Sequence, residues 1–239
     1  MLQILEKVLD DNQRQQIIDA LTQDNDHWQD GKLTAGASAK EKKNNWQLSR
    51  DHPAYAALAN TGMAALKAHP VFMSAALPKT FMPPLFSQYG VGQEYGLHVD
   101  NALQTHPDTQ QWLRTDLSLT LFLNAPEDYV GGELVIADDY GEHAVKLAAG
   151  DAVLYPSTSL HRVNSVQSGQ RLAMVTWVQS LVRSDEQRQI LHDLDISHIL
   201  LRQKLQHLNH QAIDNGLVAD ELDNLNKSYH NLLRLWAEC

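Results

Sequence analysis

The chain contains very little cysteine and no long hydrophobic run. Its 239 residues include a single cysteine, Cys239, which excludes a disulfide framework and a thiolate metal site and suits a reducing compartment. No stretch approaches the roughly 18 apolar residues that cross a membrane. The first residues also lack the basic and apolar pattern of a signal peptide. These absences favour a soluble, cytoplasmic protein.

Positive charge is scarce as well. The 19 Lys and Arg residues are outnumbered by 29 Asp and Glu, which gives a formal net charge of −10. Proteins that bind nucleic acids or anionic membranes need clustered Lys and Arg, so we expect no nucleic-acid and no membrane partner. The negative charge also disfavours acidic substrates, unless the local field at the site has the opposite sign. The length allows one sizeable domain, alone or with a small appendage.

The N-terminal part predicts a helical flank. Residues 2–9 alternate sufficiently to form a strand, and Asp10 or Asp11 then predicts the start of a short helix. A polar, glycine-containing stretch at 28–45 is typical of a loop or an irregular hairpin. A second helix is expected from residue 51 to about 69, with a proline near its first turn.

Short strands dominate the middle of the chain. Glycine and proline separate apolar segments there, which predicts strands near 82–90, 94–99, 115–124, 132–137, 143–147, 151–155, 161–166 and 171–181. Many short strands with closely spaced turns favour a barrel or sandwich. We therefore expect a mainly β fold with flanking helices (α+β), with a barrel core at about 80–181 inside a domain of residues 1–183.

After Ser184 the pattern becomes helical. Apolar residues recur at steps of three and four on both sides of a polar segment around Asn209 to Gly216. This predicts a helical hairpin at 184–239 with coiled-coil-like packing. The hairpin either covers the barrel or forms a subunit interface, and the stripes fit both, so a homo-oligomer through these helices is one expectation.

The most informative motif is His98-Val99-Asp100. Alternate side chains of a strand share one face, so His98 and Asp100 can point at the same ion. The distant His161 completes two imidazoles and one carboxylate, the facial triad of non-haem Fe(II) oxygenases. A His-x-Asp pair alone is also common in strands whose histidine is merely packed and hydrogen-bonded.

Arg171 follows His161 by ten residues and adds a second chemical element. A guanidinium suits a carboxylate, and such oxygenases must hold the far end of an oxo-acid cosubstrate. The structural alternative is a salt bridge to a local acid. Trp177 has the same strand parity as Arg171, so it lies either in the pocket wall or in the core.

The ordered set of motifs resembles a known family. The residues that carry the resemblance are Tyr89-x-x-Gly92-x-x-Tyr95-x-x-His98-x-Asp100, Phe122-Leu123-Asn124, Gly131-Gly132-Glu133-Leu134, Gly150-Asp151, His161-Arg162-Val163 and Arg171. They resemble the prolyl-4-hydroxylase-like branch of the Fe(II)/2-oxoglutarate dioxygenases, and the whole chain looks most like the PKHD-type hydroxylases.

The resemblance implies a double-stranded β-helix, or jelly roll, with iron at its open end. It assigns His98, Asp100 and His161 to Fe(II) as the catalytic centre and Arg171 to the distal carboxylate of 2-oxoglutarate, and it suggests L-ascorbate as an auxiliary reductant. The carboxylate of Asp100 favours hydroxylation over halogenation. O2 and an unidentified substrate would be the partners, with succinate and CO2 as products.

Two positions depart from the pattern of many relatives. Ala173 stands where a serine assists the same carboxylate, and Phe122 stands where some prolyl hydroxylases have a tyrosine. Tyr89 and Thr120 are the candidate substitutes. Residues 28–50 are the expected lid, and within it Asn44, Asn45 and Gln47 either line a substrate entrance or belong to a solvated loop.

Two other functions use the same motifs. One is a non-enzymatic protein that senses iron or 2-oxoglutarate and signals through its helical hairpin. The other is a cupin-like enzyme with a different divalent metal, which would share the barrel but would not need Arg171. Nothing in the sequence identifies the primary substrate.

Overall fold

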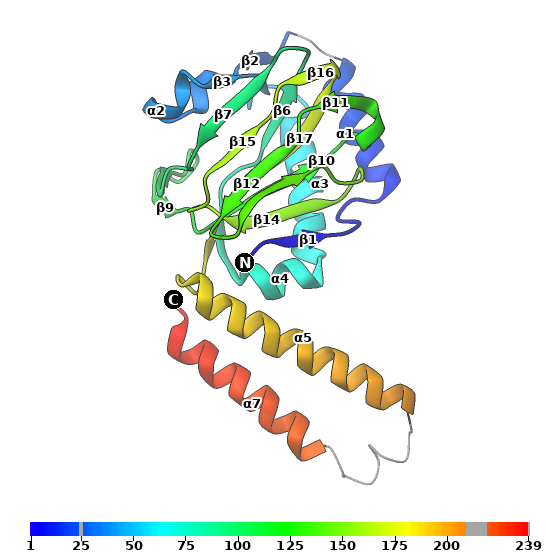
Figure 1. Ribbon diagram of the computed structural model, residues 1–239, viewed down its shortest axis with the longest axis vertical. Helices are drawn as coiled ribbons and strands as arrows, with labels where there is room; N and C mark the ends of the chain where they lie inside the picture. The colour runs from blue at the N-terminus through cyan, green and yellow to red at the C-terminus, as the bar shows by residue number, and fades with distance from the viewer. Residues whose placement is uncertain (24–25, 209–218, 239) are drawn as a thin grey trace.

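Two antiparallel sheets face each other and form a barrel, from which a pair of helices projects (Figure 1). The computed structural model describes residues 1–23, 26–208 and 219–238. The larger sheet contains, in spatial order, β1 (Gln3–Leu5), β14 (Ala152–Pro156), β10 (Leu117–Phe122), β17 (Arg171–Ser180), β6 (Leu85–Tyr89), β4 (Trp46–Leu48) and β2 (Trp28–Asp30), with β5 (Pro78–Phe81) also paired to β17. The smaller sheet contains β13 (Gly141–Val145), β12 (Leu134–Asp138), β15 (His161–Val163), β7 (Glu94–His98) and β3 (Lys43–Asn44). Two short pairs lie apart from these sheets, β8 (Leu103–Thr105) with β9 (Trp112–Arg114) and β11 (Tyr129–Gly131) with β16 (Val166–Gly169).

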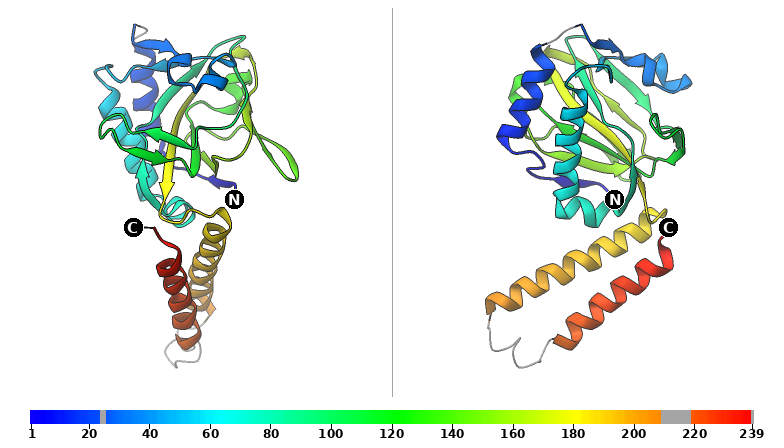
Figure 2. Two further views of the ribbon diagram at one scale, coloured as in Figure 1. Left: turned by 90° about the vertical axis from the view of Figure 1, so that its left-hand side faces the viewer. Right: turned by 180° about the vertical axis from the view of Figure 1, so that it is seen from behind.

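The helices α1 (Asp11–Gln23), α3 (Tyr55–Ala68) and α4 (Pro70–Ala76) cover the outer face of the larger sheet (Figure 2). Strand β10 shows how the sequence separates the two faces of this sheet, because alternate side chains point to opposite sides. Its three leucines at 117, 119 and 121 belong to the apolar core beneath the helices. Ser118, Thr120 and Phe122 have the opposite parity and face the barrel interior, so the inner face of this strand is partly polar.

The two C-terminal helices, α5 (Asp185–Leu208) and α7 (Ala219–Trp236), lie side by side and extend away from the barrel (Figures 1 and 2). The Ser184 hydroxyl accepts a hydrogen bond from the amide of Gln187 and so caps the start of α5. A small buried cluster of Leu77, Val182 and Leu191 joins the base of the hairpin to the barrel. The predicted turn around residues 209–216 lies outside the described residues.

The predicted mixed fold, a jelly-roll barrel with flanking helices, is confirmed. Within the described residues, none of the helices combines the length and apolar character needed to cross a membrane.

Several local predictions need correction. The stretch at 28–45 is more ordered than a loop, because it contributes β2 and β3 and, between them, the short helices η1 (Gly31–Thr34) and α2 (Ala37–Lys40). Helix α4 was not predicted. His69 caps it, accepting from the Phe72 amide, and Pro70 occupies its first turn. The short strands β8, β9, β11 and β16 were also missed, since segments of three or four residues carry too little periodicity.

Candidate metal centre

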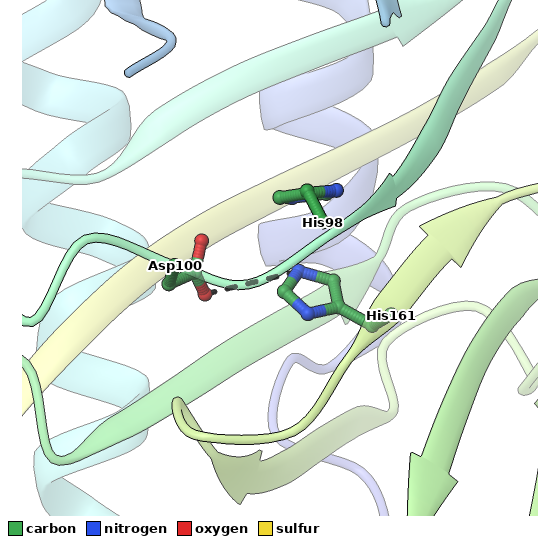
Figure 3. Close-up of side chains that lie close together, drawn as sticks. All are labelled: His98, Asp100 and His161. Atoms are coloured by element: carbon green, nitrogen blue, oxygen red, sulfur yellow. Dashed lines mark ion pairs between the residues drawn. The ribbon is translucent and has the colours of Figure 1, made fainter. Parts of the chain in front are cut away.

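Strand pairing brings the two histidines together. In the antiparallel register of β7 and β15, His98 lies directly opposite His161, and the centres of their rings are 4.2 Å apart. Asp100 lies two residues after His98, just beyond the end of β7, and its side chain faces the same site. Each of the three residues offers a ligand atom, and these atoms all lie within 4.8 Å of one another. Figure 3 shows the side chains converging from the two segments.

Hydrogen bonds to the backbone orient both imidazoles. The Nδ1 of His98 donates to the carbonyl of Gly96 at 2.8 Å, and the Nδ1 of His161 donates to the carbonyl of Ser159 at 3.0 Å. Nε2 of each ring is therefore left with its lone pair for a metal, as in most metal-binding histidines. Burial, together with the neighbouring His161, lowers the pKa of His98 to about 4. A neutral His98 is the form that binds a cation.

Asp100 is held in place by a pair of serines. The hydroxyl of Ser118 donates to Oδ2 of Asp100 at 2.6 Å and lies 2.7 Å from the hydroxyl of Ser157. The same Oδ2 is 3.8 Å from Nε2 of His161, the contact drawn as a dashed line in Figure 3. Two oriented imidazoles and one oriented carboxylate fit the ligand set of a facial Fe(II) site, which leaves positions open for other ligands.

Arg171 lies deep in the same barrel, at the start of β17 and directly opposite Tyr89 on β6. Its side chain is only 2% exposed, and its guanidinium carbon is 5.3 Å from the ring centres of both Tyr89 and Phe122. No carboxylate of the described residues lies within 4.0 Å of the guanidinium, and Nε has no hydrogen-bond partner. The local salt bridge considered from the sequence is therefore absent from the described structure.

A buried, unpaired guanidinium is costly, so an anionic ligand is its natural partner. Burial raises the pKa of Tyr89 to about 12, which keeps its hydroxyl protonated and able to donate to such an anion. Gly132, with φ of +68°, lies against the arginine, and a Cβ there would come within 3.2 Å of Cδ of Arg171. Glycine at this position leaves room for the long side chain.

One pocket connects the triad to the arginine. Its empty space, including the open mouth, is about 770 Å³, and its walls include the triad, Arg171 and the predicted substitutes Tyr89 and Thr120. Trp177 also lines this pocket. Of the three polar lid residues, Gln47 lines the pocket, Asn45 is buried without lining it, and Asn44 is exposed.

Sequence reasoning missed several polar residues of the barrel interior. Ser87 lines the pocket and is paired directly with Ala173 in the β6–β17 register, so it supplies a hydroxyl beside the position where a serine was expected. Ser118 orients Asp100, and Ser157 in turn contacts the hydroxyl of Ser118. The alternation Leu-Ser-Leu-Thr-Leu at 117–121 is the signal that would have revealed Ser118, because it places hydroxyls on one face of an otherwise apolar strand.

Comparison with known proteins identifies the family. A family model described as 2OG-Fe(II) oxygenase superfamily matches residues 84–179, and one described as PKHD-type hydroxylase C-terminal domain matches residues 185–238. A PKHD-type hydroxylase of Psychrobacter sp. (strain PRwf-1) is 65% identical, with 100% of both chains covered. Another from Acinetobacter baumannii (strain AYE) is 49% identical over 88% of each chain.

Solved structures support the fold. A prolyl hydroxylase of Trichoplax adhaerens, solved with a peptide fragment of hypoxia inducible factor, matches with a TM-score of 0.54 at 16% identity, over 80% of this chain and 86% of that one. A 2OG-Fe(II) oxygenase family oxidoreductase of Burkholderia pseudomallei matches with a TM-score of 0.52, also at 16% identity, over 74% of this chain and 82% of that one. With its facial triad and these relatives, the chain belongs to the PKHD-type hydroxylases of the 2OG-Fe(II) oxygenase superfamily.

Proposed function

We propose that this protein hydroxylates a C–H bond of its substrate, coupled to the conversion of 2-oxoglutarate and O2 into succinate and CO2. His98, Asp100 and His161 hold Fe(II), and Arg171 with Tyr89 binds the distal carboxylate of 2-oxoglutarate. The observation that carries this proposal is that one pocket is lined by a facial triad and by a buried arginine with no carboxylate partner among the described residues.

The chain's own contribution is binding and orientation. The Gly96 and Ser159 carbonyls fix the histidine rings, and Ser118 fixes the carboxylate of Asp100. The iron and 2-oxoglutarate that these residues would hold would supply the activation of O2 and the oxidation of the substrate. Arg171 sets the direction in which the cosubstrate lies, because its guanidinium donates hydrogen bonds to a carboxylate in a fixed geometry. The aromatic walls around it exclude water from that carboxylate.

Several finer points of function stay predictions. Ascorbate as a reductant rests on the family resemblance alone, and the primary substrate is unidentified. Self-association through the hairpin also stays a prediction, supported by exposed apolar side chains on its helices, namely Ile190, Ile199, Leu200, Leu201 and Leu235.

The direct test is oxygen-dependent succinate formation by protein loaded anaerobically with Fe(II) and 2-oxoglutarate. No primary substrate is required, since slow uncoupled turnover suffices. We expect Asp100→Ala to reduce succinate formation to the level of metal-free protein, because one of three iron ligands is lost. The exposed Asp139→Ala is the matched control and should behave as the wild type.

Two results would count against the proposal. Undiminished succinate formation by Asp100→Ala would remove the triad from the reaction. A wild-type protein that binds iron and 2-oxoglutarate but releases no succinate, even with candidate substrates added, would favour the non-enzymatic sensor.

A further inference from the structure

A second buried cation lines the pocket, and the proposed reaction leaves it unexplained. Lys43 lies on β3, at the edge of the smaller sheet, paired with Tyr95 of β7. Its side chain lies in the pocket wall and the residue is only 5% exposed. Nζ is 5.0 Å from the centre of the Tyr95 ring, which in turn stacks on His98 with 3.6 Å between ring centres. Lys43 is therefore close to the metal ligands.

The ammonium of Lys43 has few partners in the protein. Within the part of the chain that the structure describes it donates one hydrogen bond, to the hydroxyl of Thr34 at 3.0 Å, although an ammonium carries three donors. No carboxylate among the described residues lies within 4.0 Å of Nζ. Thr34 is itself held, since its hydroxyl is within hydrogen-bonding distance of Oε1 of Gln47 and the carbonyl of Gly31. The cation is thus fixed in position by the lid.

Fully buried lysines are rare unless they are paired. Burial lowers the pKa of Lys43 to about 8, while the negative charges of Asp100 and Asp30 act in the opposite direction. A buried lysine in a pocket wall, with no carboxylate of the described residues within 4.0 Å, shares the features on which the proposed role of Arg171 rests.

Lys43 and Arg171 belong to opposite sheets of the barrel, the smaller and the larger respectively. Arg171 is matched by the distal carboxylate of 2-oxoglutarate. With Arg171 occupied by that carboxylate, Lys43 is left as a second cation in the pocket wall. Asp100 and Asp30, the acids whose charges act on it, form no ion pair with it among the described residues.

Given the proposed oxygenase function, on which this inference rests, we propose that Lys43 binds a carboxylate of the primary substrate. The enzyme then acts on carboxylate-bearing molecules, either small acids or the free C-terminus of a peptide. Hydroxylation at carbon leaves this carboxylate unchanged, so its role is to position the substrate beside the metal.

The test compares acids with their own amides. Protein loaded with Mn(II) and 2-oxoglutarate, which does not turn over, is titrated with N-acetylglycine and N-acetylglycinamide as the small-molecule arm. The peptide arm uses acetyl-Ala-Ala-Gly with a free or an amidated C-terminus. We expect the wild type to bind at least one acid roughly 10–100-fold more tightly than its amide, the gain of a charge-assisted hydrogen bond. A preference for N-acetylglycine would indicate a small acid as the substrate, and a preference for the peptide with a free C-terminus would indicate a peptide.

Three variants assign the preference to Lys43. Lys43→Met should abolish it, whereas Lys43→Arg should retain a cation and most of the preference. Lys42→Met, an exposed neighbour on the same segment, is the matched control and should equal the wild type. In all three variants the affinity for 2-oxoglutarate should stay within about threefold of the wild-type value.

The outcomes separate this inference from the proposed function. A wild type that binds 2-oxoglutarate but no acid in preference to its amide, or no probe at all, overturns the role of Lys43 only. Loss of 2-oxoglutarate binding in Lys43→Met, with the fold intact by thermal melting, overturns it as well, because the lysine would then bind the cosubstrate. A wild type that fails to bind 2-oxoglutarate contradicts the proposed function itself.

Discussion

Two arginines of this protein are equally buried, yet their surroundings differ completely. Arg171, in the barrel, and Arg188, at the base of the hairpin, are each 2% exposed. Arg188 donates to the carbonyls of Val182 and Arg183 at 2.8 and 2.7 Å and to the carboxylate of Asp185 at 2.9 Å. Arg171 has no carboxylate partner in the described structure and faces a pocket.

The difference teaches how buried charge divides between stability and function. Arg188 is matched by groups of the same chain, and Asp185 also binds the N-terminal amino group of Met1, so this cluster fastens the hairpin to the barrel. Among the described residues Arg171 has no carboxylate partner, and in the proposed function a ligand supplies one. Burial alone does not distinguish Arg171 from Arg188, whereas the hydrogen-bond and ion-pair partners of each arginine do.

Replacing each arginine tests this comparison, and the largest effect, on the use of 2-oxoglutarate, is expected for Arg171→Met. Loss of the charged fork should raise the apparent Michaelis constant for 2-oxoglutarate by about two orders of magnitude, since truncating one partner of a buried charge pair costs about 2–5 kcal/mol. The measurement is the dependence of succinate formation on 2-oxoglutarate concentration. Arg162→Met is the control, because this arginine lies near the protein surface and pairs with Glu142. An indifferent response of Arg171→Met would favour the cupin-like alternative.

A smaller effect is expected for Arg188→Met, and it should change the stability of the protein and not its affinity for 2-oxoglutarate. The free energy of unfolding should fall by about 2 kcal/mol, because Asp185 and two carbonyls lose their donor, while the partial exposure of Asp185 limits the cost. Denaturant unfolding measures this, with the exposed Arg202→Met as a control. The affinity for 2-oxoglutarate should not change. A loss of that affinity comparable to the loss in Arg171→Met would break the distinction between the two arginines.

The triad and Arg171 were predictable from the sequence for two reasons. His98 and Asp100 lie two residues apart, a short-range spacing, whereas the distant His161 and Arg171 were supplied by the family motifs. The orienting serines were not predictable in the same way. Ser118 lies on β10 and Ser157 directly follows β14, so the two hydroxyls that meet beside Asp100 are brought together only by the pairing of these strands, which is a long-range property.

Lys43 escaped prediction for a related reason. It lies in a polar stretch that was expected to be a loop, where a lysine beside Lys42 indicates solvent exposure. The two-residue strand β3 is formed by pairing with β7 rather than by its own sequence. That pairing turns Lys43 into the barrel and leaves Lys42 outside, as alternation along a strand requires.

The central claim is that the triad and Arg171 bind the two ends of one 2-oxoglutarate molecule. The most direct measurement is 2-oxoglutarate binding by calorimetry, with and without Mn(II), in the wild type, Asp100→Ala and Arg171→Met. We predict that the metal tightens binding in the wild type by at least tenfold, that Asp100→Ala loses this metal dependence, and that Arg171→Met keeps the dependence at weaker affinity. Equal 2-oxoglutarate affinity in all three proteins, whether or not metal is present, would contradict the account.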